Sequence, residues 1–376
     1  MCGKRAALAF IPALVAYLFG LVVKSILMEK PFRIISVEPL FAIPGGEVTI
    51  KCEGFRIKHG TADGVYIEGM QCRLVAASVN RVLAIVPEDV VGVDVRAEAK
   101  LTPVHLESLG AVSNTIEMTV GRRLKSGMHI VANPAVDPAD DALILTRSGA
   151  RGQHLPVTLF RLEKDGYLDE MPEAVLNPTG IAFDREGQMF VTNRAQGEVY
   201  SIGRDGTSTV YATGLGIASG IAFDSNGLMY VGDRSGTIYR VRDFSEVETF
   251  TVMEASVAAY HLAFGPDGRL YMTAPGLASH DAVHVIDHEG FDEKFFRGLG
   301  RPQGLAFDKA GNLYVAACFK GRHGIVKISA DGKSCEHFVA GNSVVGLCFT
   351  RSGELIAATG DSVFSIPCGI QGTLLN

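Results

Sequence analysis

The stretch Pro178–Asn193, PTGIAFDREGQMFVTN, decides the fold of this chain, because a close copy returns about 40 residues later as ASGIAFDSNGLMYVGD. Each copy has the pattern of a strand, a tight Asp-x-x-Gly turn and a second strand. The apolar residue before the turn aligns the six units at Val136, Phe183, Phe223, Phe264, Phe307 and Phe349. A period near ~42 residues is that of one four-stranded blade, so we predict a six-bladed β-propeller. A solenoid of the same period is the alternative, and it would need atypical capping ends.

The ends of the repeat region indicate how the ring closes. The last unit lacks a good fourth strand, whereas GMHIVA, residues 127–132, lies upstream of the first complete unit without a blade of its own. We therefore expect residues 127–132 to form the outer strand of the last blade, which leaves no open sheet edge. The Asp residues at 184, 224 and 308 are expected to cap turns.

A different pattern precedes the repeats. From Ile34 to Gly121 short segments alternate apolar and polar residues, and Pro or Gly interrupts them at short intervals. This favours a small antiparallel β-sandwich. Cys52 and Cys72 could pair within it, or remain small buried thiols.

The N-terminus is apolar. After a short tail, residues 1–5, an uncharged stretch runs from Ala6 to Val23 and continues through Ile26–Met28. As a helix it would span roughly 27 Å, close to the ~30 Å hydrocarbon core of a bilayer. We predict a membrane anchor over residues 6–28 and a linker over 29–33, with the bulk of the chain periplasmic or extracellular. A cleaved signal peptide is the alternative.

Composition argues against one class of partner. The chain carries a net charge of −6, and its basic runs are short. Proteins that bind the phosphate backbone present a basic face, so nucleic acid is disfavoured.

Two resemblances follow from these motifs. ISVEPLFAIPGGEVTIKCEGF, RVLAIVPE and SNTIEMTVG resemble an IPT/TIG domain, an immunoglobulin-like module, over residues 34–121. PTGIAFDREGQMFVTNRAQGEVYSI and PQGLAFDKAGNLYVAACFKGRHGIVKI resemble the NHL-repeat propellers and the gluconolactonase, or senescence-marker-protein, family over residues 124–376. These families contain lactonases, lyases and binding modules, so the resemblance implies a fold more strongly than a reaction.

The gluconolactonase resemblance implies a divalent cation at one mouth of the channel, held by Glu, Asn and Asp. The matching positions here hold Ala132, Thr179, Ser219, Tyr260, Gln303 and Val345, none of which is Asp, Asn or Glu. The family's metal site is therefore not reproduced at those positions.

The same mouth nevertheless supplies the candidate site. Its predicted ligand-binding residues are Asn193, Arg194, Asp233, Arg234, Tyr260, Gln303 and Arg322. His261 replaces the Gly found in four other blades and is the candidate catalytic acid or base. Asn193 and Asp233 could instead be turn residues.

Two functions are compatible with this mouth. One is the binding of a small polar ligand or a protein partner. The other is a lactone hydrolase or lyase with a non-standard metal site, in which Asp233 and Asn193 would hold Ca²⁺, Mg²⁺, Mn²⁺ or Zn²⁺.

Overall fold

The computed structural model describes residues 32–58, 60–90, 101–149, 153–171, 175–242, 246–278 and 281–373. These residues form strands and turns, with no helix among them, so the described part of the chain is all-β as predicted. None of the described segments is a helix long and apolar enough to cross a membrane. The predicted anchor, residues 6–28, lies outside the described residues.

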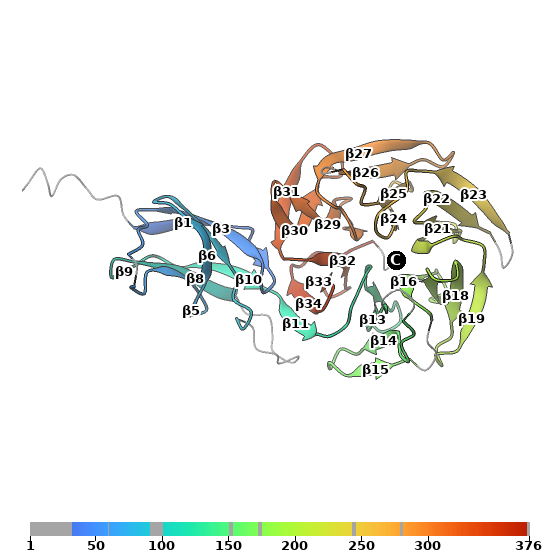
Figure 1. The fold of residues 1–376 in the computed structure, drawn as a ribbon, viewed down its shortest axis with the longest axis horizontal. Helices are drawn as coiled ribbons and strands as arrows, with labels where there is room; N and C mark the ends of the chain where they lie inside the picture. The colour runs from blue at the N-terminus through green and yellow to red at the C-terminus, as the bar shows by residue number, and fades with distance from the viewer. Residues whose placement is uncertain are drawn as a thin grey trace, which may run out of the picture.

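Six four-stranded blades surround a central channel, and Figure 1 shows the ring face-on. Each of the first five blades is read from its inner to its outer strand in chain order. The first blade has β12 (Ala135–Val136), β13 (Leu143–Thr146), β14 (Leu159–Leu162) and β15 (Leu168–Glu170), and the second has β16 (Pro178–Phe183), β17 (Met189–Asn193), β18 (Glu198–Ile202) and β19 (Ser208–Ala212). The third has β20 (Ala218–Phe223), β21 (Met229–Asp233), β22 (Thr237–Val241) and β23 (Val247–Val252), and the fourth has β24 (His261–Phe264), β25 (Leu270–Thr273), β26 (Asp281–Ile286) and β27 (Asp292–Leu299). The fifth has β28 (Leu305–Phe307), β29 (Leu313–Phe319), β30 (Arg322–Ile328) and β31 (Cys335–Ala340).

The sixth blade takes its outer strand from upstream in the chain. Its order is β32 (Val344–Phe349), β33 (Glu354–Thr359), β34 (Val363–Pro367) and β11 (Arg122–Lys125). Closure by an upstream strand is confirmed, but the prediction that residues 127–132 form that strand is wrong. Met128 and Ile130 are instead buried between the sixth and first blades, because apolar side chains there gain more than at a solvent-facing edge.

The repeated aromatic residue before each turn explains why the blades stack. Phe223 packs on Phe190 of the preceding blade, with ring centroids 5.3 Å apart. The same contact recurs between the blades that follow, as Phe264 on Tyr230, Phe307 on Tyr271 and Phe349 on Tyr314, at 5.1, 4.8 and 5.0 Å. Edge-to-face and tilted aromatic pairs at these distances are favourable. The sequence period is therefore the period of the contacts between blades.

Two sheets that share one core make up the N-terminal part. One sheet has the order β1 (Arg33–Glu38), β3 (Glu47–Glu53), β7 (Arg81–Ile85), β6 (Arg73–Ala77). The other has β2 (Phe41–Ala42), β10 (Ile116–Val120), β8 (Leu101–Ser108), β4 (Gly64–Ile67) and β5 (Met70–Gln71), with β9 (Ala111–Val112) on β8. Cys52 and Cys72 are both buried in this core as free thiols, and burial raises their pKa values to about 11 and about 12.

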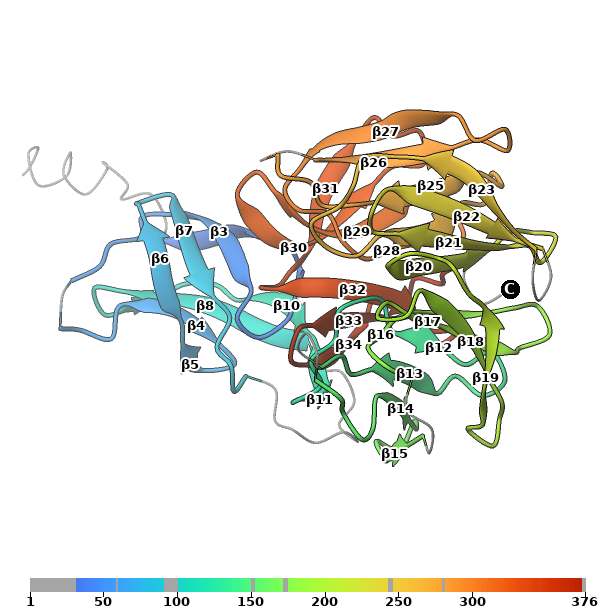
Figure 2. The ribbon, with the colours of Figure 1, turned by 45° about the vertical axis from the view of Figure 1, so that its right-hand side comes forward.

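One strand joins the sandwich to the ring. The short strand β2 pairs in parallel with β10 of the sandwich and with β31 of the fifth blade, so one sheet runs through both parts. Ile43 packs into a propeller core, and its N–H donates to Ala340 O at 2.9 Å. Figure 2 shows the sandwich lying against the side of the ring beside the fifth and sixth blades. A shared sheet fixes the two parts relative to each other.

Candidate functional site

The channel has two mouths, which the strand register defines. Pro178, at the start of β16, faces Asn193 at the end of β17, and Ala218 faces Asp233 in the next blade. We call this end the first mouth. The second mouth is the opposite end, at the turns of Asp184 and Asp224, where each inner strand finishes.

A ring of glycines brings the inner strands together near the first mouth. A Cβ added at Gly180, Gly220 or Gly346 would lie 2.5, 2.7 or 2.3 Å from a backbone oxygen of the next blade, and one added at Gly304 would lie 2.6 Å from the Cα of Gly346. Since real Cβ atoms do not approach so closely, each inner strand touches its neighbour at this level.

Asn133 occupies the same level of the first blade, and its side chain reaches the sixth and fifth blades. Its Nδ2 donates to Leu305 O in the fifth blade at 3.1 Å, and its Oδ1 accepts from Leu347 N in the sixth blade at 3.0 Å. A side chain that joins the first blade to the fifth must pass in front of the sixth. It therefore helps to close the channel.

Asn193 and Asp233 are both buried, and their side-chain oxygens accept hydrogen bonds from nearby backbone N–H groups. Asn193 Oδ1 accepts from Ala195 N at 3.0 Å, and Asp233 Oδ1 accepts from Ile217 N and Ser235 N at 2.8 and 2.9 Å. Asp233 Oδ2 also accepts from the Ser235 hydroxyl. These contacts match the turn-residue alternative, and the described residues contain no group of three or more His, Cys, Asp or Glu that could hold a metal. The two residues thus do not fit the cation predicted for them.

The two arginines and the tyrosine of the first mouth also have backbone partners. Arg194 Nη2 donates to Gly149 O at 3.3 Å, and Arg234 Nε donates to Ser256 O at 3.1 Å. Burial and the charge of Arg234 lower the pKa of Arg194. The Tyr260 hydroxyl donates to Glu254 O, and burial together with Asp233 and Glu254 raises its pKa to about 12.

His261 is enclosed rather than open to the mouth. The residue is 3% exposed, and its Nε2 has no hydrogen-bond partner within the described residues. Burial lowers the pKa of the imidazole to about 4, so it is neutral at physiological pH. A side chain so enclosed cannot touch a substrate held at the surface of the mouth.

The remaining two predicted residues lie apart from each other. Gln303 is half-buried at the first mouth, where its backbone carbonyl accepts from the Thr273 hydroxyl. Arg322 reaches the sandwich instead, with its Nε 3.7 Å from Glu47 Oε1. Arg322 therefore belongs to the contact between the two parts of the chain.

A cavity of about 670 Å³ opens at the second mouth. Its walls are the apolar faces of the inner strands, and Asn133 lines its inner end. The lining includes Val136, Ile181, Ala182, Phe183, Ile221, Ala222, Phe223, Leu262, Phe264, Cys348 and Phe349. Apolar walls with a few polar groups are typical of small-molecule sites.

The rim of this cavity is polar and rigid. The turn carboxylates cap their own turns, as predicted: Asp184 Oδ1 accepts from Gln188 N and Asp224 Oδ1 from Leu228 N, at 2.8 and 2.9 Å. Arg185 and Ser225 are exposed beside them and line the opening. Their side chains can meet the polar end of a bound molecule.

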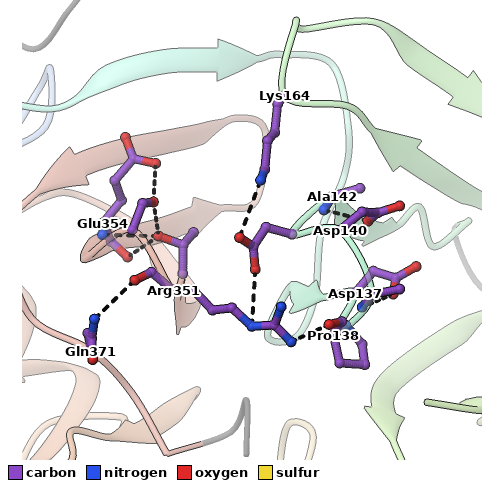
Figure 3. A network of polar contacts seen from close by, with 12 residues as sticks. Asp137, Pro138, Asp140, Ala142, Lys164, Arg351, Glu354 and Gln371 are labelled. Atoms are coloured by element: carbon purple, nitrogen blue, oxygen red, sulfur yellow. Dashed lines mark hydrogen bonds and ion pairs between the residues drawn. The ribbon is translucent and has the colours of Figure 1, made fainter.

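A polar network closes the ring beside the second mouth, where the sixth blade meets the first (Figure 3). Arg351 Nε lies 3.6 Å from Asp141 Oδ1, and its Nη2 donates to Pro138 O. Lys164 reaches the other oxygen of Asp141 at 3.3 Å, and Gln371 Nε2 donates to Arg351 O at 3.2 Å. The network ties the C-terminal tail and two blades together, which holds the opening in shape.

Comparison with known proteins supports the fold. No protein-family model and no curated protein matches the chain. Among solved structures it is similar to a gluconolactonase from Xanthomonas campestris (TM-score 0.54, 16% identity, covering 66% of this chain and 89% of that one). It is also similar to an auxiliary nutrient binding protein from Bacteroides ovatus (TM-score 0.51, 13% identity, 90% and 98%) and to a protein of unknown function from Bacteroides thetaiotaomicron (TM-score 0.54, 14% identity, 90% and 98%). The chain therefore has a gluconolactonase-like propeller fold, and the two Bacteroides structures match beyond the propeller.

Proposed function

We propose that this chain is a membrane-anchored, extracytoplasmic binding protein whose propeller takes a small molecule into the second mouth of its channel. The observation that carries the proposal is the cavity of about 670 Å³, which has apolar walls and a polar rim. At the first mouth, in contrast, the predicted asparagine, aspartate, arginines and tyrosine already have partners, and His261 is enclosed. Binding at the channel is retained from the sequence analysis, but at the opposite end.

The chemistry of the cavity describes its ligand. Ile181, Ile221 and Leu262 would cover an apolar body, and burial of that surface would supply most of the affinity. Arg185 and Ser225 at the rim would receive the polar end. The lining also carries Asp184, Asp224 and Asp267, so a small molecule with both an apolar and a polar part fits better than a ligand without an apolar part.

The proposal also includes a family for each part of the chain. The sandwich, by its resemblance to an IPT/TIG domain, would be an immunoglobulin-like spacer, and the propeller would be of the NHL or gluconolactonase type. The sheet shared through β2 supports a spacer that holds the propeller in one orientation. Residues 6–28 would anchor the chain in the membrane.

A fluorescence titration with 1-anilinonaphthalene-8-sulfonate tests the proposal, because this probe has an apolar ring system and one anionic group. We expect saturable binding that falls at least about tenfold in an Ala182→Phe variant, whose larger side chain would narrow the cavity that Ala182 lines. The matched control is Arg194→Ala at the first mouth, which should bind as the parent does. Thermal melting of both variants checks that the fold persists.

The opposite pattern would overturn the proposal. Probe affinity that survives Ala182→Phe in a folded protein, or is lost in Arg194→Ala, would place the ligand elsewhere.

A further inference from the structure

Large apolar side chains are exposed at the end of the sandwich that faces away from the propeller. Ile57, Val79, Leu109 and Val112 are 42, 57, 59 and 64% exposed. We call these four residues the distal tips. Figure 1 shows β9, which contains Val112, at this end, together with the start of β1.

Ring and hydrogen-bond contacts place the segments of Ile57, Val79 and Val112 beside the first described residues. Phe32 stacks on Phe55, with ring centroids 6.4 Å apart, and Phe55 N donates to Val79 O at 3.1 Å. Ile34 N donates to Asn114 Oδ1 at 2.8 Å, two residues after Val112. Single exposed apolar residues need no explanation, whereas a group at one end does.

The loops that carry the tips are held together by one buried carboxylate. Asp63 accepts from Lys58 N at 2.8 Å through Oδ2 and from Leu109 N at 2.7 Å through Oδ1. These bonds lower the pKa of Asp63, so the carboxylate stays charged at neutral pH. The Ser108 hydroxyl also joins the loop of Leu109 to that of Ile57. It accepts from Arg56 N at 3.0 Å and donates to Arg56 O at 2.8 Å. The tips are therefore presented by a fixed surface.

The charge beside the tips suits one kind of partner. Arg56 and Lys58 are exposed on either side of Ile57. Basic side chains beside apolar ones favour a phospholipid surface, where the cations meet phosphate and the apolar groups enter the boundary between headgroup and acyl chain.

We propose that the distal tips rest on the membrane into which residues 6–28 insert, an inference that depends on the proposed anchor. Only Glu29, Lys30 and Pro31 separate Met28 from Phe32, and this length of chain reaches at most about 14 Å. The end of the sandwich beside Phe32 must then lie near the lipid headgroups. Because β2 joins the sandwich to the ring at its side, the channel runs roughly along the membrane surface and both mouths face solution (Figures 1 and 2).

Single-tryptophan variants can test this contact, because the natural chain contains no Trp. The full chain is reconstituted in phosphatidylcholine vesicles whose lipids are brominated near the top of their acyl chains. Bromine should quench the emission of Leu109→Trp and Val112→Trp at least about twofold. The matched controls are Val252→Trp and Phe291→Trp on the propeller, at positions 70 and 69% exposed, and their emission should not change.

Flotation after an alkaline wash separates the inference from the anchor on which it rests. If the chain floats with the vesicles and the tip variants are not quenched, the anchor stands and the docking proposal is overturned. If the chain does not float, the anchor itself is wrong, and the docking proposal falls with it. Quenching of all four variants alike would also overturn docking through the distal tips.

Discussion

The two mouths of the channel are built from the same repeat and differ in almost every other respect. At the first mouth, four glycines let the inner strands touch, Asn133 links the first blade to the fifth and sixth, and Asn193 and Asp233 accept from backbone N–H groups. At the second mouth, the strands diverge around a cavity with apolar walls. Polar residues gathered at one end of a channel therefore do not by themselves indicate a site. Free volume that a ligand can enter does.

The largest effect is expected from a variant that pushes two neighbouring inner strands apart at the first mouth. A Gly346→Ala variant would put a Cβ 2.3 Å from Ala132 O, and that atom belongs to the backbone and cannot turn away. We expect a loss of about 3 kcal/mol in the free energy of unfolding, measured by denaturant titration. Gly360→Ala is the control, because nothing lies within 4 Å of its Cβ, and it should cost less than about 0.5 kcal/mol. Equal effects at the two positions would contradict a tightly closed first mouth.

A second test uses the enclosed imidazole of His261. Its pKa is lowered from 6.5 to about 4, so the unfolded chain takes up this proton first as the pH falls. The contribution of His261 to the free energy of unfolding is complete above pH 6.5 and is lost progressively toward pH 4. The loss is about 2 kcal/mol between pH 7 and pH 5. A His261→Leu variant should lack this component, and the measurement is the difference between the two stability–pH curves. Parallel curves for the two proteins would show that His261 titrates normally and is reached by water.

The smallest effect is expected at Arg322, which the sequence placed at the ligand site. Its guanidinium lies 3.7 Å from Glu47 and both side chains are partly exposed, so Arg322→Ala should change the unfolding free energy by less than about 1 kcal/mol. Probe binding at the channel should not change. A clear loss of binding in this variant, measured by the same fluorescence titration, would restore Arg322 to the site.

The features that could be predicted from the sequence are those that recur locally. The blade repeat, the Asp-x-x-Gly turns and closure by an upstream strand all leave a pattern within a few residues or one period. Val136, Phe183, Phe223 and Phe264, on which the repeats align, also line the cavity. The apolar residues at this repeated position are the sequence feature that could have indicated the cavity at the second mouth.

Closure of the first mouth could not be predicted in the same way. It depends on contacts between residues far apart in the chain, such as Asn133 with Leu305 and Leu347. Arg322 meets Glu47 for the same reason, since β2 brings the sandwich against the fifth blade. No local pattern records such contacts.

The most direct measurement is a crystal structure of residues 32–373 with a bound brominated naphthalenesulfonate, which the anomalous scattering of bromine locates. The account predicts a peak inside the second mouth, in contact with Phe183, Phe223 and Leu262, and the sulfonate toward Arg185. A peak beside Asn193 and Asp233 with an empty second mouth would contradict it.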